Sequence, residues 1–344
     1  MKQKRLILDV GNALVKWRTG SGEGSFRSAH AILADHQYEN ITSRPSYSGQ
    51  YMRINGLPVV FGEQAERHNL QTKKQGAARY SPDYYGLYVA AALADAYPSG
   101  GGEIFVYASY PPGHYPHRAA LLRAALGTYE IETIHGKRVY RVVEGNAFDE
   151  PLGGVMNLIL NEAGNAYQRS DINAGDNLVI DIGGYTTDLL SIRRGGEIDY
   201  ALMTSIPLGV NQIINDAMNS IAAAYPDLSR RTGGTLPIER VRAAIETHEF
   251  RASGRAYNVE DLIDEAVFQL INSFAGIYQA QAQGGLPYDN IILTGGGAVM
   301  LYDHLVPVLD HGSIVLAEDR DAIHLANVRG GAKLLNMYQL NGAF

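Results

Sequence analysis

The chain has 344 residues, 46% hydrophobic and 19% charged, which is typical of a soluble globular protein large enough for more than one core. Its formal net charge of −7 argues against a protein whose whole surface binds DNA or anionic lipid, so we expect no direct nucleic-acid binding. The lack of cysteine excludes disulfides, thiolate nucleophiles and Cys-based zinc sites, and favours a cytosolic setting.

The N-terminal segment MKQKRLILDV has only a short apolar run, which Asp9 interrupts. This run is too short for a signal peptide, and no other window approaches the length of a membrane span. We therefore expect a cytoplasmic protein that does not bind membranes.

Two groups of three strands are predicted, and each begins with a strand that ends in an acidic glycine turn. The first group covers residues 5–10, 13–19 and 25–34. The second covers residues 177–182, 187–193 and 197–205. The groups begin half a chain apart, and this spacing indicates an internal duplication rather than a solenoid.

Helical patterns and further strands follow each group. After the first group we predict helix 84–97, strand 103–109, helix 116–126, a hairpin around 135–137 and a helix after Pro151. After the second we predict helices 209–225 and 261–278, strand 290–294, helix 300–310, strand 313–317 and a final helix from about residue 321. This alternation implies an α/β fold with covered sheets. Residues 36–80 and 226–258 interrupt it and are predicted insertions.

Asp9 and Asp181 each lie at the end of a predicted strand, immediately before a glycine turn. Ligands bind at the carboxyl ends of strands in α/β sheets, and glycines let backbone N–H groups approach a phosphate closely. Thr186 and Thr187 add hydroxyl donors, and Lys16 adds a positive charge. Two carboxylates that face each other across a cleft suit a hydrated Mg²⁺ ion. The paired turns therefore predict a site for a metal-bound polyphosphate.

A third glycine-rich turn, TGGGA, joins the predicted strand 290–294 to a helix. A surface without side chains can lie against a nucleoside, or accept a phosphate at the helix N-terminus. Any one of these turns alone is more often only a turn. The three together, at ordered positions within a duplication, predict a shared nucleotide site.

Four arginines form a modest basic cluster in the second predicted insertion, at Arg230, Arg231, Arg240 and Arg242. We interpret this cluster as a solvated face, with a partner or filament contact as the alternative.

The three motifs resemble those of the actin-like ATPases, a superfamily that includes sugar kinases and chaperone ATPases. DVGNALVK resembles their first phosphate motif, DIGGYTTD the second and TGGGA the adenosine motif. The short length and the segments ASYPPGHY, IPLGVNQIIND and ANVRGGAKLL resemble the plasmid-segregation actins of the ParM/StbA type. The resemblance covers nearly the whole chain.

The resemblance implies an α/β, actin-like (ribonuclease H-like) fold, with duplicated βββαβαβα domains and a nucleotide cleft between them. Domain I would comprise residues 1–150 and about 326–344, with an insertion subdomain at about 36–80. Domain II would comprise residues 151–325, with an insertion subdomain at about 226–258.

The resemblance also implies roles for residues at matching positions. Asp9 and Asp181 would hold the water ligands of Mg²⁺, and Lys16 would contact the β- and γ-phosphates. The remaining nucleotide contacts would come from Gly11, Asn12, Gly183, Gly184, Thr186, Gly209, Gly295, Gly296 and Gly297. Asn12 stands where actin itself has Ser, and Tyr185 leaves open which of Thr186 and Thr187 faces the phosphate.

The family places an acid or amide between its two domains to orient the attacking water. NAFDEPLGGV, at residues 146–155, makes Glu150 our candidate for this role and Asp149 the second choice. The alternative is that Glu150 only complements the dipole of the helix it begins. Asp181 would assist catalysis through the metal, whereas for Asp188 we expect a structural hydrogen bond.

The resemblance thus implies an ATPase that forms ATP-dependent filaments, with ATP and Mg²⁺ as cofactors. Its partners would be further copies of the chain and a DNA-binding adaptor that links the filament to a plasmid or other DNA. One alternative is a non-polymerising scaffold or cell-division ATPase related to MreB or FtsA, although the C-terminus is only weakly amphipathic. The other is a small-molecule kinase, for which no catalytic base is evident.

Overall fold

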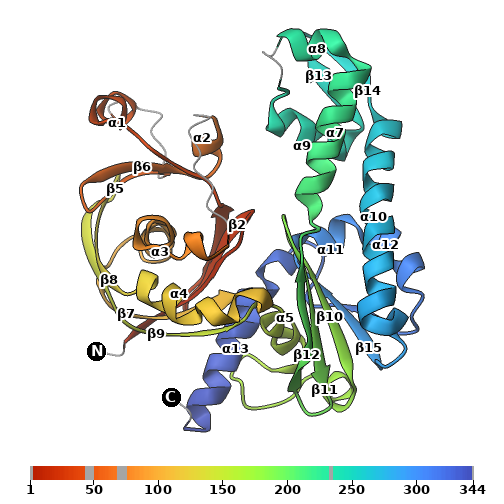
Figure 1. Ribbon diagram of the computed structural model, residues 1–344. Coiled ribbons are helices and arrows are strands. Elements are labelled where there is room, and N and C mark those ends of the chain that lie inside the picture. Colours follow the sequence, from red (N-terminus) through yellow and green to blue (C-terminus); the bar gives the residue numbers. More distant parts are fainter. Residues whose placement is uncertain (1–2, 43–49, 68–75, 232–234, 343–344) are drawn as a thin grey trace.

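A computed structural model describes residues 3–42, 50–67, 76–231 and 235–342. In these residues the strands form one nine-stranded sheet, one five-stranded sheet and a hairpin (Figure 1). The first sheet contains β1 (Lys4–Val10), β2 (Leu14–Arg18), β3 (Glu23–Arg27), β4 (His30–Ile32), β5 (Tyr51–Ile54), β6 (Leu57–Phe61), β7 (Gly102–Tyr110), β8 (Gly127–Thr133) and β9 (Gly136–Asp149). The second contains β10 (Asn177–Ile182), β11 (Thr187–Arg193), β12 (Glu197–Ile206), β15 (Asn290–Thr294) and β16 (Ile314–Leu316), and the hairpin contains β13 (Glu249–Ala252) and β14 (Arg255–Asn258).

The two sheets share one topology around their central strands. β1 pairs antiparallel with β2 and parallel with β7, and β10 pairs in the same two ways with β11 and β15. The strand orders β3-β2-β1-β7 and β12-β11-β10-β15 therefore correspond. The predicted duplication and the α/β fold class are confirmed.

Helices cover both sheets. The first half contributes α1 (Asp35–Thr42), α2 (Gly62–Arg67), α3 (Pro82–Ala96), α4 (Arg118–Ala125), α5 (Glu150–Ile159) and α6 (Ser170–Ala174). The second half contributes α7 (Val210–Ala224), α8 (Pro226–Arg231), α9 (Ile238–Thr247), α10 (Glu260–Ala282), α11 (Gly296–Met300), α12 (Tyr302–Leu309) and α13 (Ala326–Leu340). Among the described residues, no helix has the length and apolar character needed to cross a membrane.

The first sheet curls around α3 (Figure 1). β3 and β4 form its two edges, although only Ser28 and Ala29 separate them in the chain. The single strand predicted at 25–34 is therefore wrong, because β4 leaves β3 and pairs with β6 instead. β5 and β6 join the same sheet through β8, so this part of the predicted first insertion extends the main sheet. Residues 43–49 and 68–75 of that insertion lie outside the described residues.

Two other predicted boundaries differ from the structure. The final helix begins at Ala326, because residues 323–325 form a separate 3₁₀ turn before it. The helix predicted at 261–278 continues to Ala282, where Gln283 and Gly284 adopt positive φ angles and end it.

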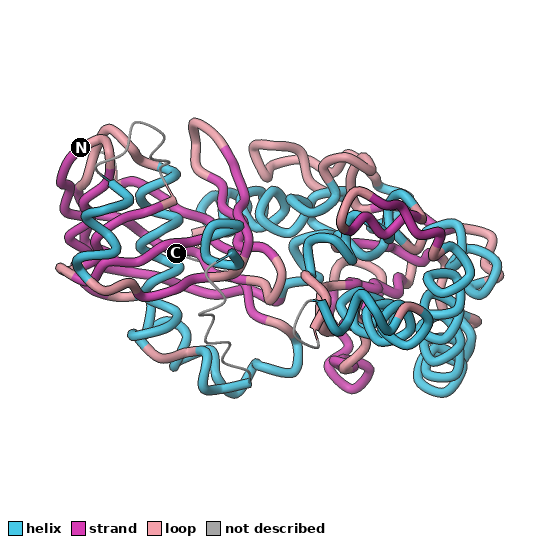
Figure 2. The backbone as a smooth tube through the Cα atoms, turned by 90° about the horizontal axis from the view of Figure 1, so that it is seen from above, coloured by secondary structure: helices cyan, strands magenta, loops and turns pink. Residues whose placement is uncertain are grey.

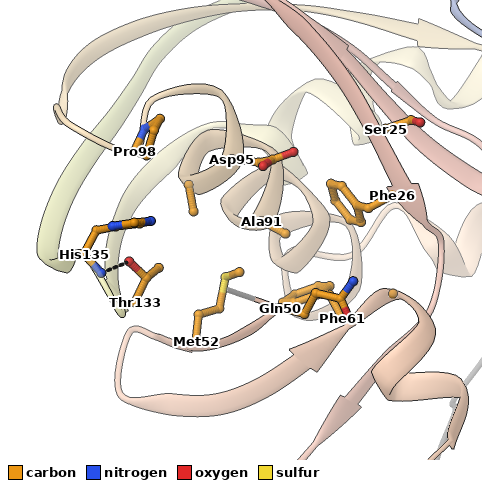
Figure 3. A pocket seen from close by; sticks show the side chains of 12 residues that line it. Ser25, Phe26, Gln50, Met52, Phe61, Ala91, Asp95, Pro98, Thr133 and His135 are labelled. Carbon is orange, nitrogen blue, oxygen red and sulfur yellow. Dashed lines mark hydrogen bonds between the residues drawn. The ribbon is translucent and has the colours of Figure 1, made fainter. Parts of the chain in front are cut away.

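The two lobes lie side by side and are joined by α5 and α13 (Figures 1 and 2). A core cluster continues from one sheet to the other through these helices, with Ile7 of the first sheet, Val179 of the second and Val155 and Val328 of the helices. The helices cross closely because a Cβ atom added to Gly330 would clash with the carbonyl oxygen of Gly153. The glycines thus place the N-terminus of α5 between the two sheets.

Candidate functional site

Asp9 and Asp181 occupy equivalent positions in the two sheets, because each is the penultimate residue of a central strand. Both are buried. Lys16 is the partner of Asp9 in the β1–β2 ladder, and its Nζ atom donates a hydrogen bond of 2.6 Å to Asp9 Oδ2. Asp188 faces Asp181 in the β10–β11 ladder. Glu150 begins α5, and its Oε1 atom lies 4.0 Å from Lys16 Nζ. The structure therefore brings the predicted acids and lysine together.

This cluster holds more negative than positive charge in a buried place. Burial raises the pKa of Glu150 well above its ordinary range, and Asp9, Asp181 and Asp188 add to the effect while Lys16 opposes it. Burial also raises the pKa of Asp181, against the influence of Lys16, and raises the pKa of Asp188 to about 7. For Lys16, burial would lower the pKa, but the surrounding carboxylates outweigh it and the pKa is raised. A further cation would be stabilised here.

The donor set fits a hydrated metal ion better than a directly coordinated one. Within the described residues, no group of three or more His, Asp or Glu side chains is arranged to hold a metal. Mg²⁺ keeps several of its waters and commonly binds through one or two carboxylates together with phosphate oxygens. The opposed Asp9 and Asp181 match that requirement.

The first two glycine turns meet between the lobes. A Cβ atom added to Gly184 would lie 2.9 Å from Cβ of Ala13, so the second turn touches the first. The N–H of Gly11 donates to the carbonyl of Leu14, and that of Gly183 donates to Thr186. Asn12, between Gly11 and Ala13, is partly exposed. The first and second glycine turns are therefore in contact with each other.

The hydroxyls of the second turn differ in availability. Thr187 is buried, and its Oγ1 donates to the carbonyl of Leu208 at 2.8 Å. Thr186 is less buried, and its Oγ1 lies 3.4 Å from Asp188 Oδ2. Thr186 is thus the hydroxyl better placed to contact a ligand. Gly209 packs against Gly184, where an added Cβ would lie 2.6 Å from the carbonyl group, so it supports this turn.

The three glycines of TGGGA are not equivalent. Gly295 has a φ of +83°, and a Cβ atom there would clash with Asp181 Oδ1. Gly297 packs against Ile182, whose Cγ2 would lie 2.5 Å from an added Cβ. Gly296 is exposed, with nothing within 4 Å of the position a Cβ would take. Gly295 and Gly297 bring this turn close to β10, and Gly296 presents the open surface.

Sequence reasoning missed Asn327, a buried residue of α13. Its Nδ2 atom donates to Asp181 Oδ2 at 2.9 Å, and its Oδ1 atom lies 3.5 Å from the Thr294 hydroxyl. The signal available in the sequence was an amide in the helix segment ANVRGG, three residues before a glycine pair. Asn327 holds one carboxylate oxygen of Asp181 in place from the linking helix.

A second contact between the lobes is an ion pair between residues that lie outside the three glycine turns. Arg242 Nη1 of α9 lies 3.2 Å and 3.1 Å from the two carboxylate oxygens of Glu66 in α2. The two side chains are only 18% and 11% exposed. The interpretation of the arginine cluster as a solvated face is therefore wrong for Arg242. It holds for Arg230, which is exposed and weakly paired within its own helix.

Comparisons with known proteins agree with this architecture. The family described as "Archaeal actin homologue MreB-like, C-terminal" matches residues 179–307. No curated protein matches the chain.

Among solved structures, the archaeal actin homologue Ta0583 superposes with a TM-score of 0.77 at 19% identity, covering 97% of this chain and 99% of that one. Its complex with ADP gives a TM-score of 0.74 at 19% identity over the same shares. A subunit of a 15-stranded ParM filament from Clostridium botulinum gives a TM-score of 0.78 at 17% identity, covering 97% and 99% of the two chains. The chain therefore has the actin-like fold, with its two lobes arranged as in Ta0583 and in the ParM filament subunit.

Proposed function

We propose that this protein is an ATPase that assembles into filaments when ATP is bound and disassembles after hydrolysis. The observation that carries the proposal is that Asp9 and Asp181 lie at equivalent strand ends, with Lys16 bonded to Asp9, near Glu150 and under the influence of Asp181. The complex of Ta0583 with ADP and the ParM filament support it, since both proteins share the fold.

We assign domain I to residues 1–150 with about 326–344, and domain II to residues 151–325. The cleft between them would receive the nucleotide. Gly11, Asn12 and Lys16 would contact its phosphates from domain I, and Gly183, Gly184 and Thr186 would do so from domain II. Gly296 would lie beside the adenosine, with Gly295 and Gly297 shaping the same turn and Gly209 supporting the second one.

Asp9 and Asp181 would hold Mg²⁺ through its water ligands, and the ion would neutralise charge on the phosphate oxygens. The buried acids favour this binding, because burial raises the pKa values of Asp181 and Glu150 and a bound cation would stabilise their ionised forms. Asn327 fixes the orientation of Asp181 during the reaction.

Glu150 would act as the base that orients the attacking water. The water oxygen forms a bond to the γ-phosphorus, the bond from that phosphorus to the β–γ bridging oxygen breaks, and ADP leaves with the electron pair. The water proton passes to the Glu150 carboxylate. A raised pKa makes that carboxylate a stronger base than an exposed glutamate, which is the direction that burial produces here.

Cleft closure would couple the nucleotide to assembly, since both lobes contact the phosphates only when closed. We extend the proposal to DNA segregation in the cytoplasm, with a DNA-binding adaptor between filament and cargo. The net charge of −7 agrees with such indirect contact.

The test is sedimentation and light scattering of the protein with ATP, ADP and a non-hydrolysable ATP analogue, with Mg²⁺ present. We expect pelleting with ATP and with the analogue, and its loss as ADP forms. Absence of nucleotide-dependent pelleting at any practical concentration would rule out the filament. The same samples report phosphate release, which measures hydrolysis independently.

Glu150→Gln separates assembly from hydrolysis. We expect it to pellet with ATP but to hydrolyse it at least about 100-fold more slowly, because the base is lost. The control is Glu239→Gln, which removes an exposed acid from the first turn of α9. Hydrolysis at the wild-type rate by Glu150→Gln would refute the catalytic assignment.

A further inference from the structure

Arg79 is a buried cation beside the first glycine turn. It ends the 3₁₀ turn Gly76–Arg79 and is only 4% exposed. Its Nη2 atom donates a hydrogen bond to the carbonyl of Val10, the last residue of β1. Val10 lies between Asp9 and Gly11, so the guanidinium is anchored at the turn that the proposed function assigns to phosphate.

The charge of Arg79 has no carboxylate partner within the described part of the chain, where every ion pair involves other residues. Its guanidinium also lies over the Tyr80 ring, 5.7 Å from the centroid, which compensates only part of a buried charge. A guanidinium has five N–H donors and is always charged, so one carbonyl bond leaves most of its donors without a described partner. Burying a charge without a counter-ion is costly.

Lys16 differs from Arg79 in this respect. Its ammonium group is already bonded to Asp9 at 2.6 Å and approached by Glu150 at 4.0 Å. These contacts neutralise much of its charge before any ligand arrives. Of these two described cations, Arg79 is therefore the one with charge left for an incoming anion.

The surroundings of Arg79 are close to the reaction centre. Burial raises the pKa of Tyr80; Arg79 opposes the effect, while Glu150 and Asp9 add to it, so Tyr80 is under the electrostatic influence of Arg79 and of both acids. The Tyr80 hydroxyl and His114 Nδ1 are 2.6 Å apart. Burial lowers the pKa of His114 to about 4, helped by Arg79 and His117, so this imidazole stays neutral and does not compete for an anion.

We propose that Arg79 binds the terminal phosphoryl group of a nucleoside triphosphate and thereby distinguishes the triphosphate from the diphosphate. The inference rests on the proposed nucleotide site and adds to it a residue outside the three glycine turns. The planar fork of a guanidinium can donate two parallel bonds to a phosphate, which a lysine cannot. Hydrolysis and phosphate release remove this contact, which makes Arg79 a sensor of the nucleotide state.

The experiment is calorimetric titration of the full chain with ADP and with a non-hydrolysable ATP analogue, each with Mg²⁺. For Arg79→Gln we expect affinity for the analogue to fall about 10- to 100-fold, the effect of losing charge-assisted hydrogen bonds, with ADP affinity changed less than about twofold. The affinity of Arg79→Lys for the analogue should lie between those of wild type and Arg79→Gln, since lysine keeps the charge without the planar fork of donors. The control is Lys4→Gln, at the opposite end of β1, where the ammonium donates to the carbonyls of Gly100 and Gly101.

Denaturant unfolding without nucleotide tests the alternative that Arg79 only holds the Val10 carbonyl. If that structural role is the whole role, Arg79→Gln should be less stable and its affinities for ADP and for the ATP analogue should fall equally. This result would overturn the inference. Unchanged binding of both ligands would overturn it as well. If Arg79→Gln does not fold, Arg79→Lys carries the same comparison. Wild-type protein that binds neither ligand would instead overturn the proposed function itself.

Discussion

Breaking the ion pair between Glu66 and Arg242 should speed nucleotide release. The pair joins α2 of one lobe to α9 of the other, and these helices face each other across the upper part of the molecule (Figure 1). In the proposed function, opening of the cleft would separate the two side chains. Their contact would therefore stabilise a closed form over an open one.

The distances set the size of the effect. At 3.1 Å, opposite unit charges attract by about 5 kcal/mol in a medium of effective dielectric constant about 20. Hydration of both groups and side-chain freedom in the open form offset most of this energy, so a largely buried pair contributes about 1–2 kcal/mol. That range corresponds to about 5- to 30-fold in the population of the open form.

The assay follows the dissociation of a fluorescent ADP derivative by stopped flow. Glu66→Gln and Arg242→Gln should each release it about 5- to 30-fold faster, and the double variant should be no faster than the singles, because both remove the same contact. Arg240→Gln is the matched control, since Arg240 lies on the same helix and donates to a carbonyl within its own lobe. Fully additive effects of the two changes would refute the reasoning.

A readout without nucleotide keeps this prediction independent of the proposed activity. The chain has no cysteine, so spin labels can be placed at two chosen sites without background. Ile32→Cys in the first lobe and Arg230→Cys in the second are exposed positions on either side of the pair. Arg242→Gln should lengthen and broaden the distance distribution between the labels. An unchanged distribution would mean that the pair does not hold the lobes together.

Three further outcomes are expected. Gly330→Ala should lower the free energy of unfolding by about 1–3 kcal/mol in urea titrations, because the new Cβ atom would clash with a carbonyl of α5. The control Gly276→Ala, on an open helix face, should leave the free energy of unfolding unchanged or raise it. Gly295→Ala should weaken nucleotide binding by displacing the carboxylate of β10 that it packs against, while the neighbouring Gly296→Ala should leave the fold intact, as circular dichroism will report. Burial lowers the pKa of His114 to about 4 in the folded state, below its unfolded value. Its contribution to stability is therefore present above about pH 6.5 and is lost as the pH falls through about 4. His114→Gln should reduce this acid-induced loss of stability by on the order of 1 kcal/mol, since the imidazole is partly exposed. Equal acid sensitivity of wild type and variant would contradict this assignment.

The sequence predicted the central strands and the long helices because their patterns are local. The strand 177–182 is fully buried, and the periodic face of α10 places Ile263, Val267 and Ile271 in the core. The separation of β3 from β4 could not be predicted, since residues 25–34 show one continuous pattern. The break follows from pairing with β6, a contact between distant parts of the chain.

The site could be predicted only where its residues stand in a motif. Asp9 and Asp181 lie at the ends of apolar strands, directly before glycine turns, and this local pattern predicted them as site residues. Asn327 and Arg79 occupy unremarkable positions in the sequence, and their importance depends on which carbonyl or carboxylate the fold places beside them. The nucleotide contacts assigned to the three glycine turns remain predictions.

The charge balance of the cleft gives a reason for these residues to act together. Among the described residues, Glu150, Asp181 and Asp188 lie near one lysine that is already paired with Asp9, and burial raises the pKa values of all three acids. A nucleoside triphosphate alone would add negative charge and repel them. On the proposed function, it would bind together with a divalent cation at Asp9 and Asp181, and Arg79, which has no carboxylate partner among the described residues, would receive its last phosphate. Loss of that phosphate would remove the anion bound by Arg79, so in this proposal hydrolysis would weaken the contact between the lobes that the Glu66–Arg242 pair also maintains.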